Sequence, residues 1–296
     1  MDVVLARQLR ERSSASRRVP ADRTAARRPL IEPFAVLFER GGLPSYELPR
    51  DLAEIYGAIG FEDRALYSNF VGSLDGVVAL GDTPSAGSLI SGRNQHDRFL
   101  MGLLRACADA VLLGAGTLRA TPGHRWTAEH IFPQMAGAFA ELRSNLGRRP
   151  RTALVLFTAS GEIPLAHPAV IDGATIVTTK TGAEKLEGRL PKSCDVMVEE
   201  RDGRVDVRRA VDELRSRGYG VLLTEGGPHL MGDLLRADLL DELFITESPL
   251  VAGRKSEQRY GMVAGAELLP DVRLWSRLLS VRRSGDFLFL RYALNR

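Results

Sequence analysis

Short apolar runs separated by amphipathic stretches organise the chain from residue 31 onward. Strands are predicted at residues 67–71, 110–113, 152–157, 174–179, 221–224, 241–246 and 287–292. Helices are predicted at residues 48–59, 94–108 and 207–217. This alternation predicts an α/β fold of three layers, in which a mostly parallel central sheet ends in an antiparallel C-terminal edge.

The helix predicted at residues 94–108 has one clearly apolar face. Its apolar positions from Phe99 to Cys107 recur at i, i+1, i+4, i+5 and i+8, which leaves Arg98 and Arg105 on another face. By this pattern alone, Arg105 is expected to be a solvated arginine. The helix at residues 48–59 is expected to end before Gly60, a residue type suited to a C-cap.

A pair of glycines follows the strand predicted at residues 221–224. Residues 224–228 read Thr-Glu-Gly-Gly-Pro, and the apolar positions that come next predict that a helix begins at Pro228. Glycine lets backbone N–H groups approach an anion closely, and the first turn of a helix offers unpaired N–H donors. The motif therefore predicts a phosphate seat, with an ordinary strand-to-helix turn as the alternative.

Two more loops of small residues follow predicted strands. Residues 114–119 read Gly-Ala-Gly-Thr-Leu-Arg, and residues 158–161 read Thr-Ala-Ser-Gly. The first loop departs from the G-x-G-x-x-G dinucleotide fingerprint, because Arg119 stands at the third glycine. Ligands bind at the carboxyl ends of strands in open α/β sheets. Three such loops suit a dinucleotide better than a single phosphate group.

Composition narrows the class of protein. The chain has 296 residues, of which 44% are hydrophobic and 26% charged, as in globular proteins with one large domain or two small ones. Its two cysteines fit no zinc-binding spacing, so no metal site is expected. No apolar run approaches the roughly 20 residues of a membrane span. We therefore expect a cytoplasmic protein without a membrane partner.

Positive charge is concentrated at the N-terminus. Residues 1–30 carry eight arginines against three acids, a net charge of +5, whereas the whole chain has +3. Because these residues include no aromatic side chain for base stacking, a disordered extension is favoured over a nucleic-acid-binding arm. The predicted division is a basic tail at 1–30, an extension at 31–63 that packs on the body, and a main domain at 64–296.

Several short segments recur in the order of a known family. They are Ser73-Leu74-Asp75-Gly76, Ile90-Ser91-Gly92, Leu104-Arg105-Ala106, Asp109 to Thr117, Thr224 to Leu230, Asp241-Glu242-Leu243 and Pro249 to Gly253. Over residues 64–294 the chain thus resembles the reductase domain of riboflavin biosynthesis, the RibD C-terminal family, which has the dihydrofolate reductase fold. Bifunctional members add an N-terminal zinc deaminase. Its signature is absent here, so the resemblance implies a stand-alone, NADPH-dependent reductase.

The resemblance also implies a set of site residues. Contacts to NADPH are implied for Gly72, Leu89, Gly114, Gly116, Thr117, Thr121, Thr158, Ser160, Gly226, Gly227, Pro228, His229, Leu230 and Met231. Contacts to the substrate are implied for Ser88, Arg105, Arg125 and Glu225. Arg105 would hold a sugar phosphate through its bidentate guanidinium group.

The loop after residue 119 departs from the family pattern. The family has Asp-Asp-Pro and then a substrate-binding arginine, whereas residues 120–127 read Ala-Thr-Pro-Gly-His-Arg-Trp-Thr. Arg125 is the expected replacement. Trp126 is expected either to cover a flat heterocycle or to anchor the loop in the core. The implied substrate is 5-amino-6-(5-phosphoribosylamino)uracil or a close relative, and the altered loop leaves a pterin or another C=N or C=C compound open.

Two acids are candidates for proton chemistry. Asp75 and Glu225 are expected near the cleft in which a hydride reaches C1′ of a ring-opened Schiff base, and either acid could orient the substrate or relay a proton. The alternative for Asp75 is a turn residue in an Asp-Gly pair, and water could supply the proton. A non-catalytic NADPH-binding protein is the alternative class. The resemblance further implies a homodimer, for which the apolar strand at residues 287–290 is suited.

Overall fold

The computed structural model describes residues 29–81, 86–254 and 259–295. Residues Ile31–Arg296 form one compact unit. The basic tail predicted at residues 1–30 therefore lies almost wholly outside the described residues. Within the described part of the chain, no helix is long and apolar enough to cross a membrane.

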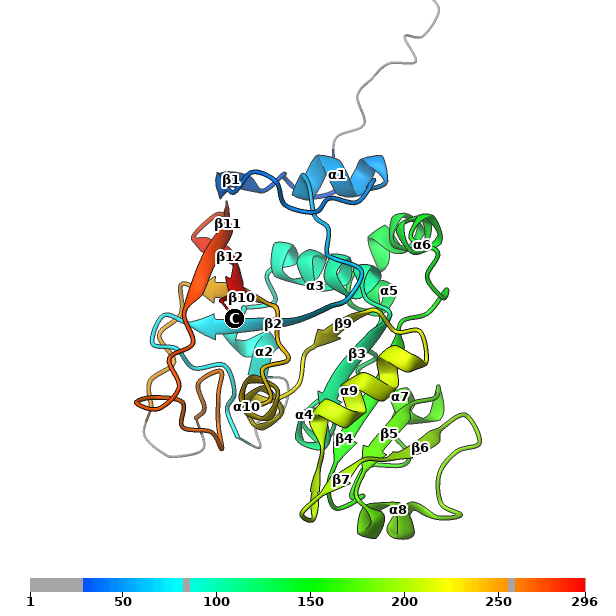
Figure 1. The fold of residues 1–296 in the computed structure, drawn as a ribbon. Helices are drawn as coiled ribbons and strands as arrows, with labels where there is room; N and C mark the ends of the chain where they lie inside the picture. The colour runs from blue at the N-terminus through cyan, green and yellow to red at the C-terminus, as the bar shows by residue number, and fades with distance from the viewer. Residues whose placement is uncertain (1–28, 82–85, 255–258, 296) are drawn as a thin grey trace, which may run out of the picture. The chain divides into compact units, whose positions relative to one another are not determined.

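A ten-stranded sheet runs through the compact unit (Figure 1), in the order β1-β11-β12-β10-β2-β9-β3-β4-β5-β6. The strands are β1 (Ala35–Glu39), β2 (Ala65–Ser73), β3 (Ala110–Gly114), β4 (Ala153–Thr158), β5 (Thr175–Thr178), β6 (Asp195–Val198), β9 (Val221–Thr224), β10 (Glu242–Ser248), β11 (Ser276–Ser284) and β12 (Phe287–Leu294). Neighbours from β10 to β6 pair in parallel, whereas β1, β11 and β12 pair antiparallel. The predicted parallel sheet with an antiparallel C-terminal edge is confirmed.

Helices cover both faces of this sheet. They are α1 (Arg50–Tyr56), α2 (Ala86–Ile90), α3 (Gln95–Cys107), α4 (Ala115–Ala120), α5 (Ala128–Ile131), the 3₁₀ turn η1 (Pro133–Met135), α6 (Ala136–Asn145), α7 (Pro168–Ile171), α8 (Lys180–Leu186), α9 (Val207–Ser216) and α10 (Pro228–Arg236). One apolar core joins Tyr67 of β2 to α3 and α6, and a second joins the adjacent Leu66 to α9 and α10. Successive strand residues point to opposite faces, so the predicted three layers are confirmed.

Helix α3 packs closely on helix α6. Asn94 caps its N-terminus by accepting hydrogen bonds from the backbone N–H groups of His96 and Asp97. A Cβ atom at Gly102 would lie 2.7 Å from Cζ of Phe139 in α6, so a larger residue would separate the two helices. On the same side of α3, Arg105 is 0% exposed, which corrects the expectation of a solvated arginine.

The residues before the main domain are tied to the sheet by two buried arginines. Arg282 of β11 donates hydrogen bonds to the carbonyl oxygens of Tyr56 and Ala58, and its guanidinium lies over the Tyr56 ring. Arg291 of β12 donates to the carbonyl of Gly60. The first helix ends earlier than predicted, because Gly57 already adopts a φ of 88°.

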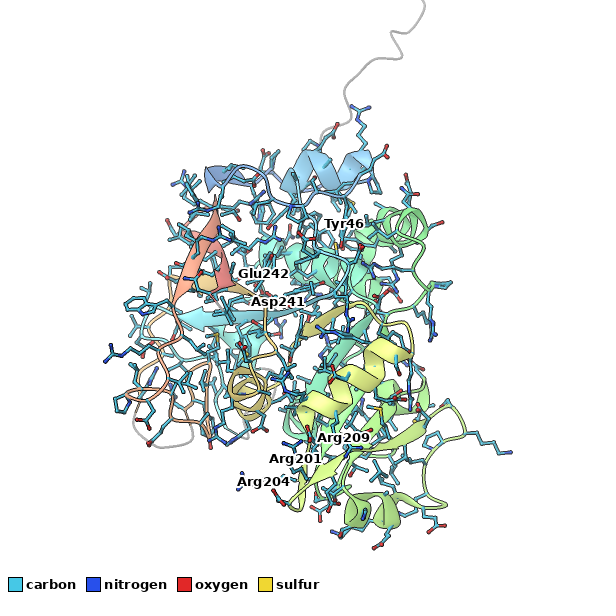
Figure 2. The ribbon with its side chains drawn as sticks, in the orientation of Figure 1. Tyr46, Arg201, Arg204, Arg209, Asp241 and Glu242 are labelled. Carbon is cyan, nitrogen blue, oxygen red and sulfur yellow. The ribbon has the colours of Figure 1, made fainter. Side chains whose placement is uncertain are left out.

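A short antiparallel hairpin, β7 (Glu200–Arg201) with β8 (Arg204–Val205), leads into α9. Figure 2 shows Arg201, Arg204 and Arg209 close together there. Two of them pair with acids: Arg201 lies 3.0 Å from Asp206, and Arg209 lies 3.2 Å from Glu199. These surface pairs join the hairpin to the start of the helix.

Candidate active site

A cleft of about 1010 Å³ opens beside the carboxyl ends of β2 and β9 and the helix after β3. Residues of α2, α3, α4 and α5 and the start of α10 complete its walls. Parallel strands carry their connecting loops to a common edge, where α/β proteins bind ligands. The loops after β3 and β9, two of the three identified in the sequence, therefore meet where a ligand can lie.

Many of the predicted site residues line this cleft. They are Ser88, Arg105, Gly116, Thr117, Thr121, Glu225, Gly226, Gly227, Pro228 and His229. Others lie outside its lining: Gly72, Asp75, Leu89, Gly114, Arg125, Thr158, Ser160, Leu230 and Met231. Leu230 and Met231 are 6% and 0% exposed and pack in the core between α10 and the sheet. Their side chains therefore hold the helix, and only their backbone is available to a ligand.

The glycine pair forms a seat at the N-terminus of α10. Gly227 is the N-cap residue, Pro228 occupies the first turn as predicted, and no side chain caps the helix. The N–H groups of His229 and Leu230 belong to the first turn, which has no intrahelical acceptors for them. A Cβ atom at Gly227 would lie 3.2 Å from Oγ1 of Thr117, so the absence of a side chain keeps the space between the two loops open. This cradle fits a phosphate group.

Glu225 is held in the cleft wall by Arg105. Nε of Arg105 donates to Oε1 of Glu225 at 2.9 Å, and Nη2 donates to Oε2 at 2.6 Å. The two side chains are 0% and 7% exposed. A bidentate pair with this little water fixes the orientation of the carboxylate. Each Glu225 oxygen keeps acceptor capacity for a ligand in the cleft.

The remaining donors of Arg105 are also occupied. Nη1 donates to the carbonyl oxygens of Thr127 at 3.3 Å and Arg125 at 3.5 Å. Nη2 lies 3.2 Å from Nε2 of His124. A guanidinium has five N–H groups, and all five point at protein atoms here. This arrangement argues against the implied phosphate contact of Arg105, because a phosphate would have to displace existing bonds.

His124 lies in the cleft as a neutral side chain. Burial, followed by the charge of Arg105, lowers its pKa to about 2. Because Arg105 can only donate, Nε2 of His124 must accept, which places the proton of the neutral ring on Nδ1. The ring also packs edge-on against Trp126 and His130. His124 can therefore offer one fixed N–H donor over the whole physiological pH range.

The altered loop places its two predicted residues differently. Trp126 lines the cleft but is only 5% exposed, so it has both of the roles expected as alternatives, in the cleft wall and in the core. Arg125 turns away: its Nε donates to Asp172 at 2.6 Å, on the surface. The side chain expected to replace the family's arginine is thus engaged outside the cleft.

Asp75 joins two loops. Its carboxylate accepts hydrogen bonds from Oγ of Ser73 and from the backbone N–H groups of Ala252 and Gly253. The bond from Ser73, followed by that from Ala252, lowers the pKa of Asp75 to about 2. Gly76 follows with a φ of 78°. This is the geometry of the turn alternative, and an ionised carboxylate has no proton to donate at neutral pH.

The third predicted loop begins at the end of β4. Oγ of Ser160 accepts from the backbone N–H of Glu162, and Nη1 of Arg119 donates to the carbonyl of the same Glu162 at 3.1 Å. Arg119 also lines the cleft. It therefore bridges the cleft and the loop that carries Thr158 and Ser160. In the sequence Arg119 stood out only as a departure from a fingerprint.

Several residues that line the cleft were not predicted. They include Asn69, Arg93, Asp97, Arg98, His124, His130 and Tyr260. Arg98 carried a signal, since it shares a helix face with Arg105, two turns away. Asn69 lies within the buried strand β2, and a polar residue there is itself informative. The others come from loops or helix ends, where residue spacing carries little information.

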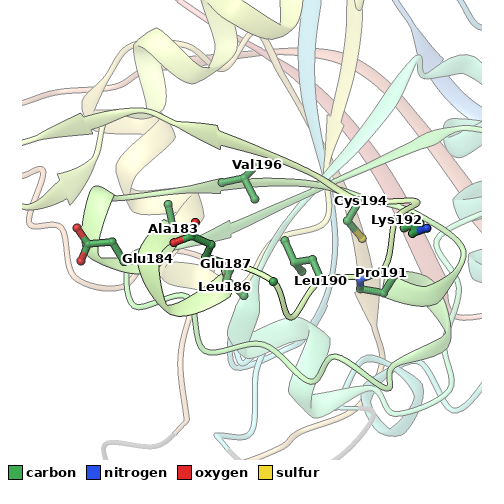
Figure 3. Close-up of a pocket in the computed structure, with 10 residues that line it drawn as sticks. Ala183, Glu184, Leu186, Glu187, Leu190, Pro191, Lys192, Cys194 and Val196 are labelled. Carbon is green, nitrogen blue, oxygen red and sulfur yellow. The ribbon is translucent and has the colours of Figure 1, made fainter.

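A second hollow lies between α8 and the edge strand β6, with a volume of about 530 Å³ (Figure 3). Its lining includes Glu184, Glu187, Lys192, Cys194 and apolar side chains. None of the predicted site residues lies there. The described residues hold no cluster of three or more His, Cys, Asp or Glu side chains arranged to bind a metal. The first cleft is thus the candidate active site.

Comparison with known proteins connects this cleft to a family. The model of the RibD C-terminal domain matches residues 64–280. A 2,5-diamino-6-ribosylamino-4(3H)-pyrimidinone 5′-phosphate reductase of Archaeoglobus fulgidus is 26% identical over 197 residues, which are 64% of this chain and 83% of that protein.

Solved structures with the same fold include two reductase-like proteins. A pyrimidine reductase-like protein of Corynebacterium diphtheriae matches with a TM-score of 0.61 and 20% identity, over 83% of this chain and 98% of that one. A riboflavin biosynthesis reductase of Saccharomyces cerevisiae matches with a TM-score of 0.53 and 14% identity, over 81% and 94%. These likenesses support the dihydrofolate reductase-like fold.

Proposed function

Since the chain belongs to the RibD C-terminal domain family, we propose that it is an NADPH-dependent reductase of a phosphorylated ribosylaminopyrimidine. The observation that carries the proposal is the cleft in which the Gly226-Gly227 seat and the fixed Glu225 carboxylate face one space. Two substrates of this class differ at C2 of the pyrimidine, which bears an amino group in one and an oxygen in the other. The proposed function does not choose between them.

The seat at α10 would hold the cofactor. Gly226 and Gly227 admit a pyrophosphate to the backbone, and the hydroxyl of Thr117 lies on the opposite side of the same space. NADPH supplies a hydride when bound, and the hydride acceptor would be C1′ of the ring-opened substrate. The protein contributes position: the seat and the Glu225 side chain hold the two partners within reach of each other.

Arg119 would make the site selective for NADPH over NADH. It lies between the cleft and Ser160, and an arginine beside the ribose of a dinucleotide accommodates a 2′-phosphate. Replacing Arg119 with alanine is expected to raise the Kd for NADPH about 10- to 100-fold, the loss of a charge-assisted hydrogen bond of roughly 1.5–3 kcal/mol. The Kd for NADH should stay the same.

Calorimetric titration of both cofactors checks this. NADH is the internal control, because it lacks only the 2′-phosphate. An equal rise in the Kd for both cofactors would mean that Arg119 maintains the conformation of the loop. An unchanged Kd for NADPH would mean that Arg119 does not contact the cofactor.

The substrate would lie against Glu225 and the loop after α4. The Glu225 carboxylate would accept from ribose or ring donors, and Nδ1–H of His124 would donate to an oxygen. For the substrate phosphate, Arg98 is a better candidate than Arg105. Its Nε and Nη2 donate to one carbonyl, that of Ile131, and leave further N–H groups for a ligand in the cleft it lines.

Turnover tests the proposal. The wild-type protein is expected to oxidise NADPH, followed by its absorbance, when either phosphorylated ribosylaminopyrimidine is added. A pterin serves as the comparison, because the altered loop made it an alternative substrate. NADPH oxidation with the pterin but not with the pyrimidines would support a reductase and contradict the proposed pyrimidine substrate. Cofactor binding without any oxidation would favour a non-catalytic protein.

Three further parts of the proposal rest on the family alone. We propose a homodimer, a cytoplasmic location and activity without a metal. The strand suggested for dimer contact, β12, lies inside the sheet between β11 and β10. The outer strand on that side is β1, where Val36 and Leu37 are more than half exposed. Contact between copies would therefore involve β1 or a face of the sheet.

A further inference from the structure

Four polar residues form a buried group at one end of the cleft. They are Asn69 of β2, Ser91 after α2, Asp97 of α3 and Thr246 of β10, with exposures of 9%, 3%, 4% and 0%. We call them the Asp97 cluster. Asn69, Ser91 and Asp97 line the cleft. No part of the proposed function uses them.

Strand alternation brings the cluster together. Asn69 pairs in register with Phe244 across the parallel strands β2 and β10. Tyr67 and Phe244 belong to the apolar core that contains α3. Side chains two residues apart on a strand share a face, so Asn69 and Thr246 also point toward α3, which carries Asp97.

The cluster is not satisfied by the protein itself. Oδ1 of Asn69 is buried and has no hydrogen-bond partner among the described residues. Such an atom costs about 1–3 kcal/mol, and most buried polar atoms in proteins are paired. Because Asn69 lines the cleft, a ligand bound there is a candidate to supply the missing donor.

Asp97 adds a carboxylate to this group. Burial, and to a smaller extent the charge of Glu225, raise its pKa to about 6, while the hydroxyls of Thr246 and Ser91 and the charge of Arg98 oppose the rise. Asp97 is thus largely ionised at neutral pH, although it is 4% exposed. A buried carboxylate of this kind accepts strongly from any N–H group placed against it.

The position of the cluster points to the substrate. In the sheet, β9 and β3 carry the glycine loops for the cofactor phosphates, and β4 carries the Thr158 loop. The cluster lies on β2 and β10, beyond β9 and away from β4. A cofactor that runs from β4 toward β9 would have its reactive end near β2. A substrate heterocycle would then lie against the Asp97 cluster.

We propose that Asp97, together with Asn69, binds the 2-amino and N3–H groups of a 2-amino-4-oxopyrimidine and thereby selects the diaminopyrimidinone over the corresponding uracil. This rests on the proposed reductase function. The amino form presents two adjacent donors to a carboxylate. The uracil presents N3–H and a C2 oxygen, so one carboxylate oxygen would face another acceptor, an unfavourable contact that also leaves both atoms unpaired.

The test compares kcat/KM for the two substrates in three proteins: the wild type, Asp97→Asn, and Asp212→Asn as a matched control on the exposed side of α9. The wild type should prefer the diaminopyrimidinone by about 100-fold or more, as expected of a site built around hydrogen bonds to its substrate. Asp97→Asn should reduce this preference at least tenfold and raise kcat/KM for the uracil, because an amide can donate to C2=O and accept from N3–H. Asp212→Asn should behave as the wild type.

The expected rise in kcat/KM for the uracil cannot arise from partial unfolding of Asp97→Asn, because unfolding would lower kcat/KM for both substrates. An unchanged preference in Asp97→Asn, an equal loss on both substrates, or a wild type that prefers the uracil would overturn the selection by Asp97 while leaving a reductase. A wild type that binds NADPH but reduces neither pyrimidine would overturn the proposed function and this inference together.

Discussion

Replacing Arg105 with alanine is expected to lower the free energy of unfolding by about 3–5 kcal/mol, because it leaves the buried Glu225 carboxylate without its partner. It also removes the contacts to the carbonyls of Arg125 and Thr127, which hold the loop after α4. Activity should fall equally on phosphorylated and dephosphorylated substrates, since the lost function is the orientation of Glu225. Denaturant unfolding and steady-state kinetics measure the two effects.

A double-mutant cycle that combines Arg105→Ala with Glu225→Gln measures the interaction energy between the two side chains, apart from the other contacts that each of them makes. If the two side chains act together, the double variant should be more stable than the sum of the single losses predicts. The contradicting outcome is an Arg105→Ala protein that has wild-type stability but loses activity only on the phosphorylated substrate. Such a result would support the phosphate contact that the family resemblance implies. Arg105 would then bind phosphate directly.

Replacing Gly227 with valine is expected to raise the Kd for NADPH about 100-fold or more. The new side chain would begin 3.2 Å from Oγ1 of Thr117 and fill the space above the first turn of α10. Two charge-assisted hydrogen bonds from the backbone to a phosphate, each worth roughly 1.5–3 kcal/mol, would be lost. Calorimetric titration with NADPH measures the change.

Gly137→Ala is the matched control. Gly137 lies in α6, is exposed, and has no atom within 4 Å of an added Cβ, so the cofactor affinity should not change. Normal NADPH binding by Gly227→Val would mean that the glycine pair is an ordinary turn, the alternative raised from the sequence.

The parallel part of the fold could be predicted because its strands are buried on both faces. β3 and β9 are continuous apolar runs, and their predicted bounds agree with the structure to within one residue. Strand β11 was missed. Its Arg282 is 2% exposed but reads as a surface residue, because its partners, the carbonyls of Tyr56 and Ala58, lie more than 220 positions away in the sequence.

The site could be predicted only where the backbone determines it. The glycine seat follows from residue types that any strand-to-helix turn around an anion requires, and its residues do meet in the cleft. Side-chain partners depend on tertiary contacts. The Arg105–Glu225 pair joins residues 120 positions apart, and the Asp97 cluster combines α3 with two strands. Neither arrangement can be predicted from the spacing of residues along the chain.

Deuterium transfer from NADPH that carries deuterium at both C4 positions of the nicotinamide tests the central claim most directly. The wild-type protein is incubated with the labelled cofactor and a phosphorylated ribosylaminopyrimidine, and the product is analysed by mass spectrometry and NMR. A reductase of this class should deliver one deuterium to C1′ of the sugar chain, in a ribitylamino product. Unlabelled pyrimidine recovered from a reaction in which the cofactor binds, or deuterium in the ring instead of at C1′, would contradict the account.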